Sequence, residues 1–401
     1  IQGGLAGLGL TSFLKPRVLS ASEHSQRKFL FVFCEGGWDQ CYLFAPLWGE
    51  GNISMEPNSQ LGEIGGIRFV DSEAKPAVRG FLEEYHSRTC FINGIGVRSV
   101  AHDTCLRLIA AGTPSPECDD WGTLIASDRA NRSVMPSVVL SGSSFAFHHS
   151  SAVTRMGING QFASLLQTED FRPNQLDLLE DQWVQDQQEK REAQGIRHRA
   201  LQGKANKAEN SIQSVQSLAD ELIFSNSSEE SHLNVELNLA KVLLSSGATE
   251  IVSLQHKGAM NLGYDTHAAN HLQGRNIQEL FQCLHQFYQD VEVNHPELFE
   301  NLTIVLFSEM GRHPVLNPQQ GKTHWMHTSA VLIGSGIQGD TVVGEYDRDS
   351  LSQPVNLHSG LVDSSGLFLQ PSHLGASLLH LAGVQQPELL QGVDPIWAAL
   401  S

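Results

Sequence analysis

The sequence lacks paired CxxC motifs, a surplus of basic residues and any apolar run of transmembrane length. Its six cysteines, at positions 34, 41, 90, 105, 118 and 283, stand singly, so neither a zinc ribbon nor a thioredoxin-type redox site is indicated. Export would allow disulfides, but the spacing does not give their pairing. Only 26 Lys and Arg residues stand against 44 Asp and Glu residues, for a formal net charge of −18. Because this field repels phosphate backbones and anionic lipid headgroups, no nucleic-acid partner is expected.

The first 22 residues, IQGGLAGLGLTSFLKPRVLSAS, are apolar, rich in small residues and followed by a polar stretch. About a dozen apolar residues are too few for a membrane-spanning helix, which needs roughly 20. The stretch is typical of the apolar core and cleavage region of an export signal without its basic start; a packed N-terminal helix is the alternative. We therefore expect residues 1–22 to be the remnant of an export signal or an N-terminal anchor. Membrane association is expected through this segment alone.

Continuous apolar runs that end in glycine or polar residues recur along the chain. Runs of this kind are typical of strands buried on both faces of a parallel sheet. The six runs are KFLFVFCEGG (28–37), TCFINGIG (89–96), PSVVLSG (136–142), TEIVSLQ (249–255), LTIVLFSE (302–309) and SAVLIGSG (329–336).

Helical patterns lie between several of these strands, for example HLNVELNLAKVLLSSG at 232–247. Alternation of strands and helices predicts an α/β fold with a doubly wound, mostly parallel sheet. A charged stretch nearly free of helix breakers, about 174–224, predicts a long helical insertion that stands off the sheet. It either packs on its own domain or docks a protein partner through its apolar seam. We therefore expect a single domain over 23–401 that includes this insertion.

Polar residues follow the predicted strands. In open α/β sheets, ligands gather at the carboxyl ends of the strands, so these residues are candidates for one shared site. Carboxylates and imidazoles together suit zinc, manganese or iron, and predict a site for a divalent metal. Each segment alone has a plainer reading, such as a self-bonded turn or an ion pair between neighbours. The candidates are Asp39 after the first strand, Asp265 and His267 after the fourth, Glu309 and Arg312 after the fifth, and His324 and His327 ahead of the last.

Several motifs also carry a family resemblance. GGWD, LGYDTHAANH, VLFSEMGRHP, GKTHWMHTSAVLIGSG and the closing LQPSHLGASLLHLAGV resemble, in order and spacing, an exported bacterial family called domain of unknown function 1501. That family is similar to the alkaline phosphatase and sulfatase superfamily, which implies that fold and one or two divalent metals. The leader looks like the tail of a twin-arginine signal, which implies export to the periplasm or cell envelope. The resemblance implies Asp39, Asp265, His267, Glu309 and His324 as metal ligands.

Two positions depart from the family pattern. Ala101 stands before His102 where relatives often have serine, and Thr323 stands before His324 where they often have aspartate. The first change removes a hydroxyl that would serve as nucleophile, and the second leaves His327 as a substitute ligand. Two functions follow: an atypical or degenerate member that acts as a subunit or scaffold of an exported assembly, or a metal-dependent hydrolase of phosphate or sulfate esters. In the hydrolase, His102 and Arg312 are the expected catalytic residues, with Arg312 holding the anionic ester.

Overall fold

An eight-stranded sheet runs through the part of the chain that the structure, a computed structural model, describes: residues 27–130, 132–133, 135–156 and 231–401. The strand order is β12-β4-β11-β8-β1-β7-β5-β6. Within this sheet β11 runs antiparallel to both of its neighbours, β4 and β8, whereas the other pairs are parallel. The start of β11 therefore lies at the edge where the other strands end.

The bounds of the elements are as follows. The strands of the large sheet are β1 (Lys28–Cys34), β4 (Thr89–Gly96), β5 (Ser137–Val139), β6 (Val153–Arg155), β7 (Ile251–His256), β8 (Leu302–Phe307), β11 (His327–Gly334) and β12 (Thr341–Val343). Two small antiparallel pairs lie outside it, β2 (Gln60–Ile64) with β3 (Ile67–Asp71), and β9 (Gly311–Arg312) with β10 (His324–Trp325). The helices are α2 (Pro76–Tyr85), α3 (His102–Ala111), α4 (Trp121–Asp128), α8 (His232–Ser245), α9 (Leu272–Asn294), α10 (Pro296–Asn301) and α11 (Pro371–Ala382).

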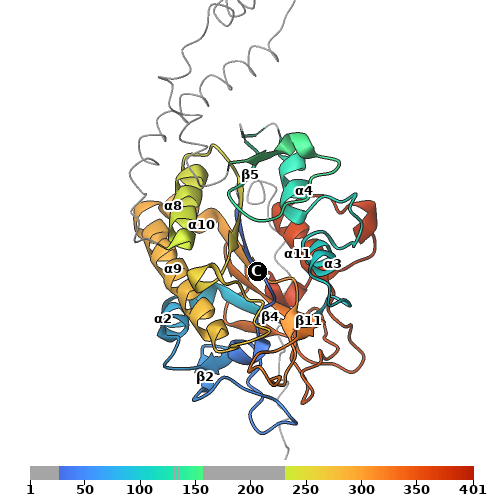
Figure 1. Ribbon diagram of the computed structural model, residues 1–401. Coiled ribbons are helices and arrows are strands. Elements are labelled where there is room, and N and C mark those ends of the chain that lie inside the picture. The colour runs from blue at the N-terminus through green and yellow to red at the C-terminus, as the bar shows by residue number, and fades with distance from the viewer. Residues whose placement is uncertain (1–26, 131, 134, 157–230) are drawn as a thin grey trace, which may run out of the picture.

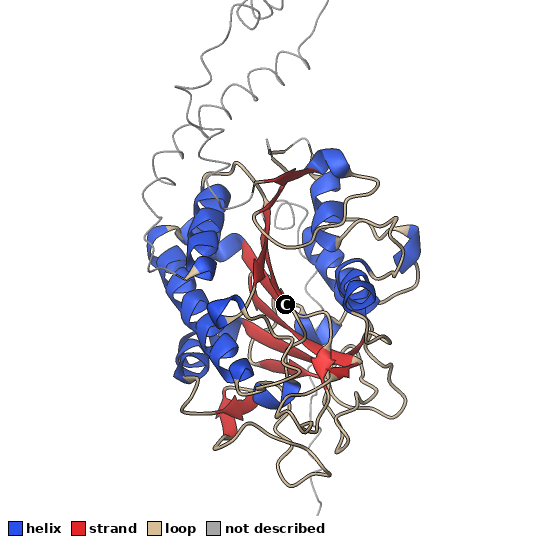
Figure 2. Ribbon diagram, viewed as in Figure 1, coloured by secondary structure: helices blue, strands red, loops and turns tan. Residues whose placement is uncertain are grey.

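Strand β1 shows why the apolar runs form a buried sheet. Successive side chains of a strand point to opposite faces, and here both faces meet helices. Leu30 and Val32 pack in one core with residues of α2, α8 and α9, whereas Phe29 and Phe31 pack in a second core with residues of α3, α4 and α11. Figure 1 shows these two groups of helices on opposite sides of the sheet, and Figure 2 shows the sheet between them.

The predicted fold class is confirmed: the protein is α/β, with a mostly parallel sheet covered on both faces. All six predicted strands are present, and the predicted helix at 232–247 is α8. The predicted leader at 1–22 and the helical insertion at about 174–224 lie outside the described residues, so both stay predictions. None of the described helices has the length and apolar character to cross a membrane. All six cysteines are buried.

Helix α8 buries a carboxylate beside the sheet. Glu236 is fully buried, and its oxygens have no well-formed hydrogen bond within the described residues. The Nδ1 atom of His232, one turn earlier on the helix, lies 3.9 Å from a Glu236 oxygen. Burial raises the pKa of Glu236 to about 7. The hydrogen bond with Ser141 and the charge of Lys257 act in the opposite direction but are weaker than burial. The side chain is therefore protonated when the protein is folded in mildly acidic solution.

The raised pKa of Glu236 predicts a pH effect on stability. The folded protein holds this proton up to about pH 7, whereas the unfolded chain loses it near its ordinary value of 4.5. The contribution of Glu236 to the free energy of unfolding is therefore greatest below pH 4.5 and is lost as the pH rises through 7. The free energy of unfolding, measured with denaturant, should fall between pH 5 and pH 8. This fall should be smaller in Glu236→Gln than in the natural protein. Identical pH dependence in the two proteins would contradict this assignment.

Candidate metal centre

Two glycines bring separate loops together at the carboxyl edge of the sheet. Gly36 lies two residues after β1 with φ of +111°, and a Cβ there would lie 2.3 Å from the backbone nitrogen of Asp265. A Cβ on Gly321 would lie 2.1 Å from the carbonyl carbon of His267. Only glycine allows backbones to approach this closely. The loop after β7 is therefore seated between the end of β1 and the segment that leads to His324.

Three imidazoles and one carboxylate converge where these loops meet. The Nε2 atom of His324 lies 3.0 Å from Nε2 of His102 and 2.9 Å from Nε2 of His267. The carboxylate of Asp265 lies 3.4 Å from Nε2 of His324, 3.2 Å from Nε2 of His267 and 3.6 Å from Nε2 of His102. His102, Asp265 and His324 each offer one ligand atom within 4.8 Å of the others. We call the four residues His102, Asp265, His267 and His324 the His–Asp cluster.

The spacing of the His–Asp cluster fits a small metal ion. Ligand atoms 2.0–2.1 Å from a tetrahedral zinc ion are about 3.3 Å apart. The five distances that involve His324 or Asp265, 2.9–3.6 Å, bracket that value. The compact group is His102, Asp265 and His324, whose ligand atoms all lie within 4.8 Å of one another, and His267 adjoins it through His324 and Asp265. Imidazole nitrogens with one carboxylate oxygen are a donor set that zinc accepts.

Hydrogen bonds on the far side of two rings orient them. Nδ1 of His324 lies 2.7 Å from the carbonyl oxygen of Val100. A carbonyl only accepts, so Nδ1 of His324 carries the proton, and its Nε2 bears the lone pair in the neutral ring. Nδ1 of His102 lies 2.7 Å from a carboxylate oxygen of Glu309, which gives His102 the same orientation. With both rings neutral, their Nε2 lone pairs would face each other, so a proton on Nε2 of His102 or a bound cation stabilises this contact.

Glu309 is a buried anchor for His102. Only 2 % of its surface is exposed, and its carboxylate also accepts the backbone N–H groups of Gly36 and Gly37 and the hydroxyl of Ser308. His102 is the first residue of α3, directly after the N-cap Ala101. Glu309 therefore ties the start of α3 to the ends of β1 and β8.

Arg312 binds the Asp265 carboxylate. Its side chain is fully buried and donates to the carbonyl oxygens of Gly36, Gly37 and Lys322 as well as to the Asp265 carboxylate. These acceptors occupy the guanidinium. In the structure Arg312 holds the Asp265 carboxylate in place. The role expected from the sequence, in which Arg312 holds an anionic ester, stays a prediction.

Charges at the His–Asp cluster shift several pKa values. Hydrogen bonds to Asp265 and Glu309 raise the pKa of His102 to about 9, against the effect of burial. Burial alone would raise the pKa of Asp265, but hydrogen bonds from His102 and Arg312 outweigh it and hold the pKa well below its usual range. Burial and the positive charges of Arg312 and His102 lower the pKa of His324. The cluster thus favours an ionised carboxylate beside the neutral His324 ring.

Two predicted ligands lie apart from the His–Asp cluster. Asp39 is fully buried, pairs with Lys322 at 2.7 Å, and accepts hydrogen bonds from the Asn270 amide and the backbone of Cys41. The bond from Cys41 caps the short helix Gln40–Tyr42 that follows β1. Both carboxylate oxygens of Asp39 are thus occupied by protein partners. His327 begins β11 and pairs with Gly96 of β4, and its Nδ1 atom has no hydrogen bond within the described residues. Glu309 touches the cluster only through His102.

The sequence missed the parts that support the cluster. His102 was expected as a catalytic residue, and its ring instead lies among the candidate ligands. The carbonyl of Val100 and the Lys322 partner of Asp39 have no motif of their own. Lys322 does stand two residues before His324 in GKTH, where a lysine next to candidate ligands signals a buried carboxylate nearby.

The role of Glu309 can be tested by Glu309→Gln. The amide keeps an oxygen for the backbone N–H groups but removes the negative charge that faces His102. Loss of a supporting carboxylate weakens metal affinity by about 10–100-fold, and we expect that loss for zinc measured by competition with a chromophoric chelator. An unchanged zinc affinity would show that Glu309 has no part in holding His102. The matched control is Glu345→Gln, which removes an exposed carboxylate elsewhere.

Fold and site together define a doubly wound α/β protein with a histidine and carboxylate cluster at the carboxyl edge of its sheet. The chain belongs to the family described as protein of unknown function DUF1501, whose model matches residues 26–371. The resemblance drawn from the sequence motifs is thereby confirmed. No curated protein matches the chain.

Several solved structures share the general fold. One is a protein of the alkaline phosphatase superfamily from Vibrio parahaemolyticus, with 11% identity, a TM-score of 0.42, and coverage of 92% of this chain and 69% of that one. Another is the C-terminal periplasmic domain of EcEptC from Escherichia coli in complex with Zn, with 8% identity, a TM-score of 0.40, and coverage of 92% and 86%. The PsFucS1 sulfatase from Pseudoalteromonas sp. has 7% identity, a TM-score of 0.38, and coverage of 95% and 74%. At these identities and TM-scores, the functions of those proteins cannot be assigned to this chain.

Proposed function

We propose that this protein binds one divalent ion of the zinc class through the His–Asp cluster and hydrolyses anionic esters there. The observation that carries the proposal is the convergence of three imidazole Nε2 atoms and one carboxylate, with two of the rings held from behind by Glu309 and Val100. An isolated histidine pair needs no such support. Rings fixed on their far nitrogens are typical of metal ligands.

The cluster is open enough for a substrate to reach it. The side chains of His102, Asp265 and His267 are 37, 45 and 47% exposed, and that of His324 is 22% exposed. A bound ion of this class polarises an ester oxygen and lowers the pKa of water from about 15.7 to near 7. Three of the four ligand groups are held by neighbours, because Glu309 fixes His102, Arg312 fixes Asp265 and the Val100 carbonyl fixes His324.

The attacking group is proposed to be water. Ala101 stands at the N-cap of α3, directly before His102, and brings no hydroxyl to the cluster. The neighbouring Ser99 hydroxyl accepts the backbone N–H of Ala101, so it is engaged in the turn. A phosphate or sulfate ester would then be cleaved in one displacement, without a covalent link to a serine of this position.

A non-catalytic function is the second candidate. Ala101 offers no nucleophile, and Thr323 has an exposed side chain and takes no part in the cluster. In this case the ion would hold the loops of a scaffold or subunit together. The predicted export to the periplasm or cell envelope and the protein partner for residues 174–224 belong to both candidates and are proposed on the sequence alone.

Metal analysis and turnover separate these functions. Protein purified without chelators is analysed for metals, and then assayed with p-nitrophenyl phosphate, bis(p-nitrophenyl) phosphate and p-nitrophenyl sulfate, before and after chelation and zinc replacement. We expect about one ion per chain, and turnover that chelation removes and zinc restores. Bound zinc with no turnover would support the scaffold, and a chain that binds no divalent metal would refute the centre itself.

A further inference from the structure

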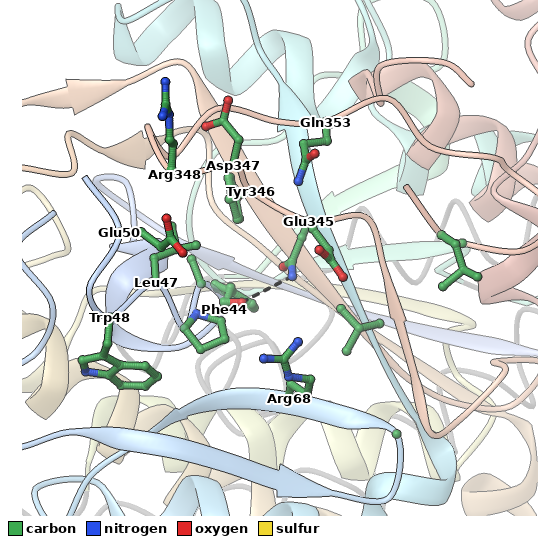
Figure 3. Close-up of a pocket in the computed structure, with 17 residues that line it drawn as sticks. Phe44, Leu47, Trp48, Glu50, Arg68, Glu345, Tyr346, Asp347, Arg348 and Gln353 are labelled. Carbon is green, nitrogen blue, oxygen red and sulfur yellow. Dashed lines mark hydrogen bonds between the residues drawn. The ribbon is translucent and has the colours of Figure 1, made fainter. Parts of the chain in front are cut away.

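A second concave site lies away from the His–Asp cluster. A pocket of about 630 Å³ opens between the loop after β1, strand β3 and the segment that follows β12. Figure 3 shows its labelled side chains, with Trp48 at one side, Arg68 below, and Glu345 and Gln353 across from them. Ligand pockets for small molecules have volumes of roughly 300–1,000 Å³, so the space suits a molecule of one to three rings.

The pocket offers hydrogen-bonding groups that the fold itself does not use. The guanidinium of Arg68, the carboxylate of Glu345 and the amide of Gln353 all line it. Within the described residues, none of these three side chains has a hydrogen bond or an ion pair. Arg68 only donates, Glu345 only accepts, and Gln353 does both. A ligand with groups that both donate and accept would satisfy all three.

The charges of the lining disfavour a strongly anionic ligand. Three acidic residues, Glu50, Glu345 and Asp347, line the pocket with two basic residues, Arg68 and Arg348, so a phosphorylated or polysulfated molecule would meet more acidic than basic groups. The apolar part of the lining includes Trp48, which is 36% exposed, and Leu361, which is 66% exposed. A flat aromatic ring beside mixed donors and acceptors suits a molecule with an apolar face and hydroxyl edges.

We propose that this pocket binds sugar units of a neutral oligosaccharide. Each sugar hydroxyl donates and accepts, which matches Arg68, Glu345 and Gln353 together, and the C–H face of a pyranose ring packs against Trp48. A zwitterionic amino acid also matches an arginine and a glutamate. Its binding would depend on ion pairs with Arg68 and Glu345, which are exposed, and exposed ion pairs contribute little. A sugar chain gains instead from many hydrogen bonds and from the aromatic wall.

The experiment is calorimetric titration of the full chain with maltotriose, cellotriose and chitotriose, and in parallel with leucine and glycyl-leucine. We expect at least one trisaccharide to bind with a dissociation constant of about 1 mM or tighter, which corresponds to roughly −4 kcal/mol. Trp48→Ala is expected to weaken that binding about tenfold. Glu345→Gln is expected to weaken it as well, whereas Glu63→Gln, an exposed carboxylate on β2 outside the lining, leaves it unchanged.

The outcomes decide the proposal either way. Sugar binding that survives His324→Ala and is lost in Trp48→Ala supports a glycan site independent of the metal centre. The proposal is overturned if none of the trisaccharides binds, if only leucine or glycyl-leucine binds, or if Trp48→Ala binds the sugar as tightly as the natural chain. Circular dichroism of Trp48→Ala shows whether the variant is folded, and Glu345→Gln provides the second test if it is not.

Discussion

His324→Ala is expected to abolish stoichiometric metal binding. Nε2 of His324 is the atom that lies within 3.0 Å of both other imidazoles, so its removal opens the middle of the cluster. Losing a supporting group costs about 10–100-fold in metal affinity, and losing a ligand should cost more than that. After dialysis against buffer with trace zinc, the zinc content measured by elemental analysis should fall from about one ion per chain in the natural protein to near zero in the variant.

His327→Ala is the matched control for this experiment. It changes the same residue type three positions on, at the start of β11, where the ring takes no part in the cluster. We expect its zinc content to equal that of the natural chain. If His327→Ala loses zinc and His324→Ala keeps it, the ligand assignment is wrong, and the substitute ligand suggested by the sequence is the real one.

Lys322→Met is expected to destabilise the fold strongly. Lys322 and Asp39 form an ion pair at 2.7 Å with neither side chain exposed. Burial alone would lower the pKa of Lys322, but Asp39 and Cys41 outweigh this and raise it, so the Lys322 ammonium is charged in the folded protein. Removing one partner of a buried pair costs about 3–5 kcal/mol because the other charge stays buried without compensation. Denaturant unfolding at neutral pH measures the loss.

Two further variants test the cause of this loss. Asp39→Asn combined with Lys322→Met removes both charges and should recover part of the free energy of unfolding. Arg348→Ala breaks a contact between Arg348 and Asp349, whose side chains are 77% and 65% exposed respectively. It should change the free energy of unfolding by less than about 0.5 kcal/mol. A Lys322→Met protein as stable as Arg348→Ala would rule out a structural role for the buried pair.

The sequence predicts the sheet well because its strands are buried on both faces. The run KFLFVFC alternates between two cores and has no polar face, and its buried pattern is visible without a structure. The direction of β11 could not be predicted, since an apolar run reads the same in either direction. Strands β6 and β12 have three residues each, too few for a pattern to stand out.

The site could be predicted only in its residue types. Asp265, His267 and His324 meet as expected from loops at the carboxyl edge, because strand ends bring distant segments together. Asp39 follows β1 at the same edge, but two positions beyond Gly37 its carboxylate turns inward and pairs with Lys322. Which way a side chain points after a tight turn depends on backbone angles that no residue pattern specifies.

The reversed strand β11 has a consequence for the order in which the molecule opens. His324 precedes β11, whereas Asp265 and His267 come after β7. An ion held at this point would also join His324 to His102, which lies 222 positions earlier in the chain. Stripping the ion should then loosen the β9–β10 pair first, and deuterium uptake should rise in residues 311–325 while β1 and β7 stay protected.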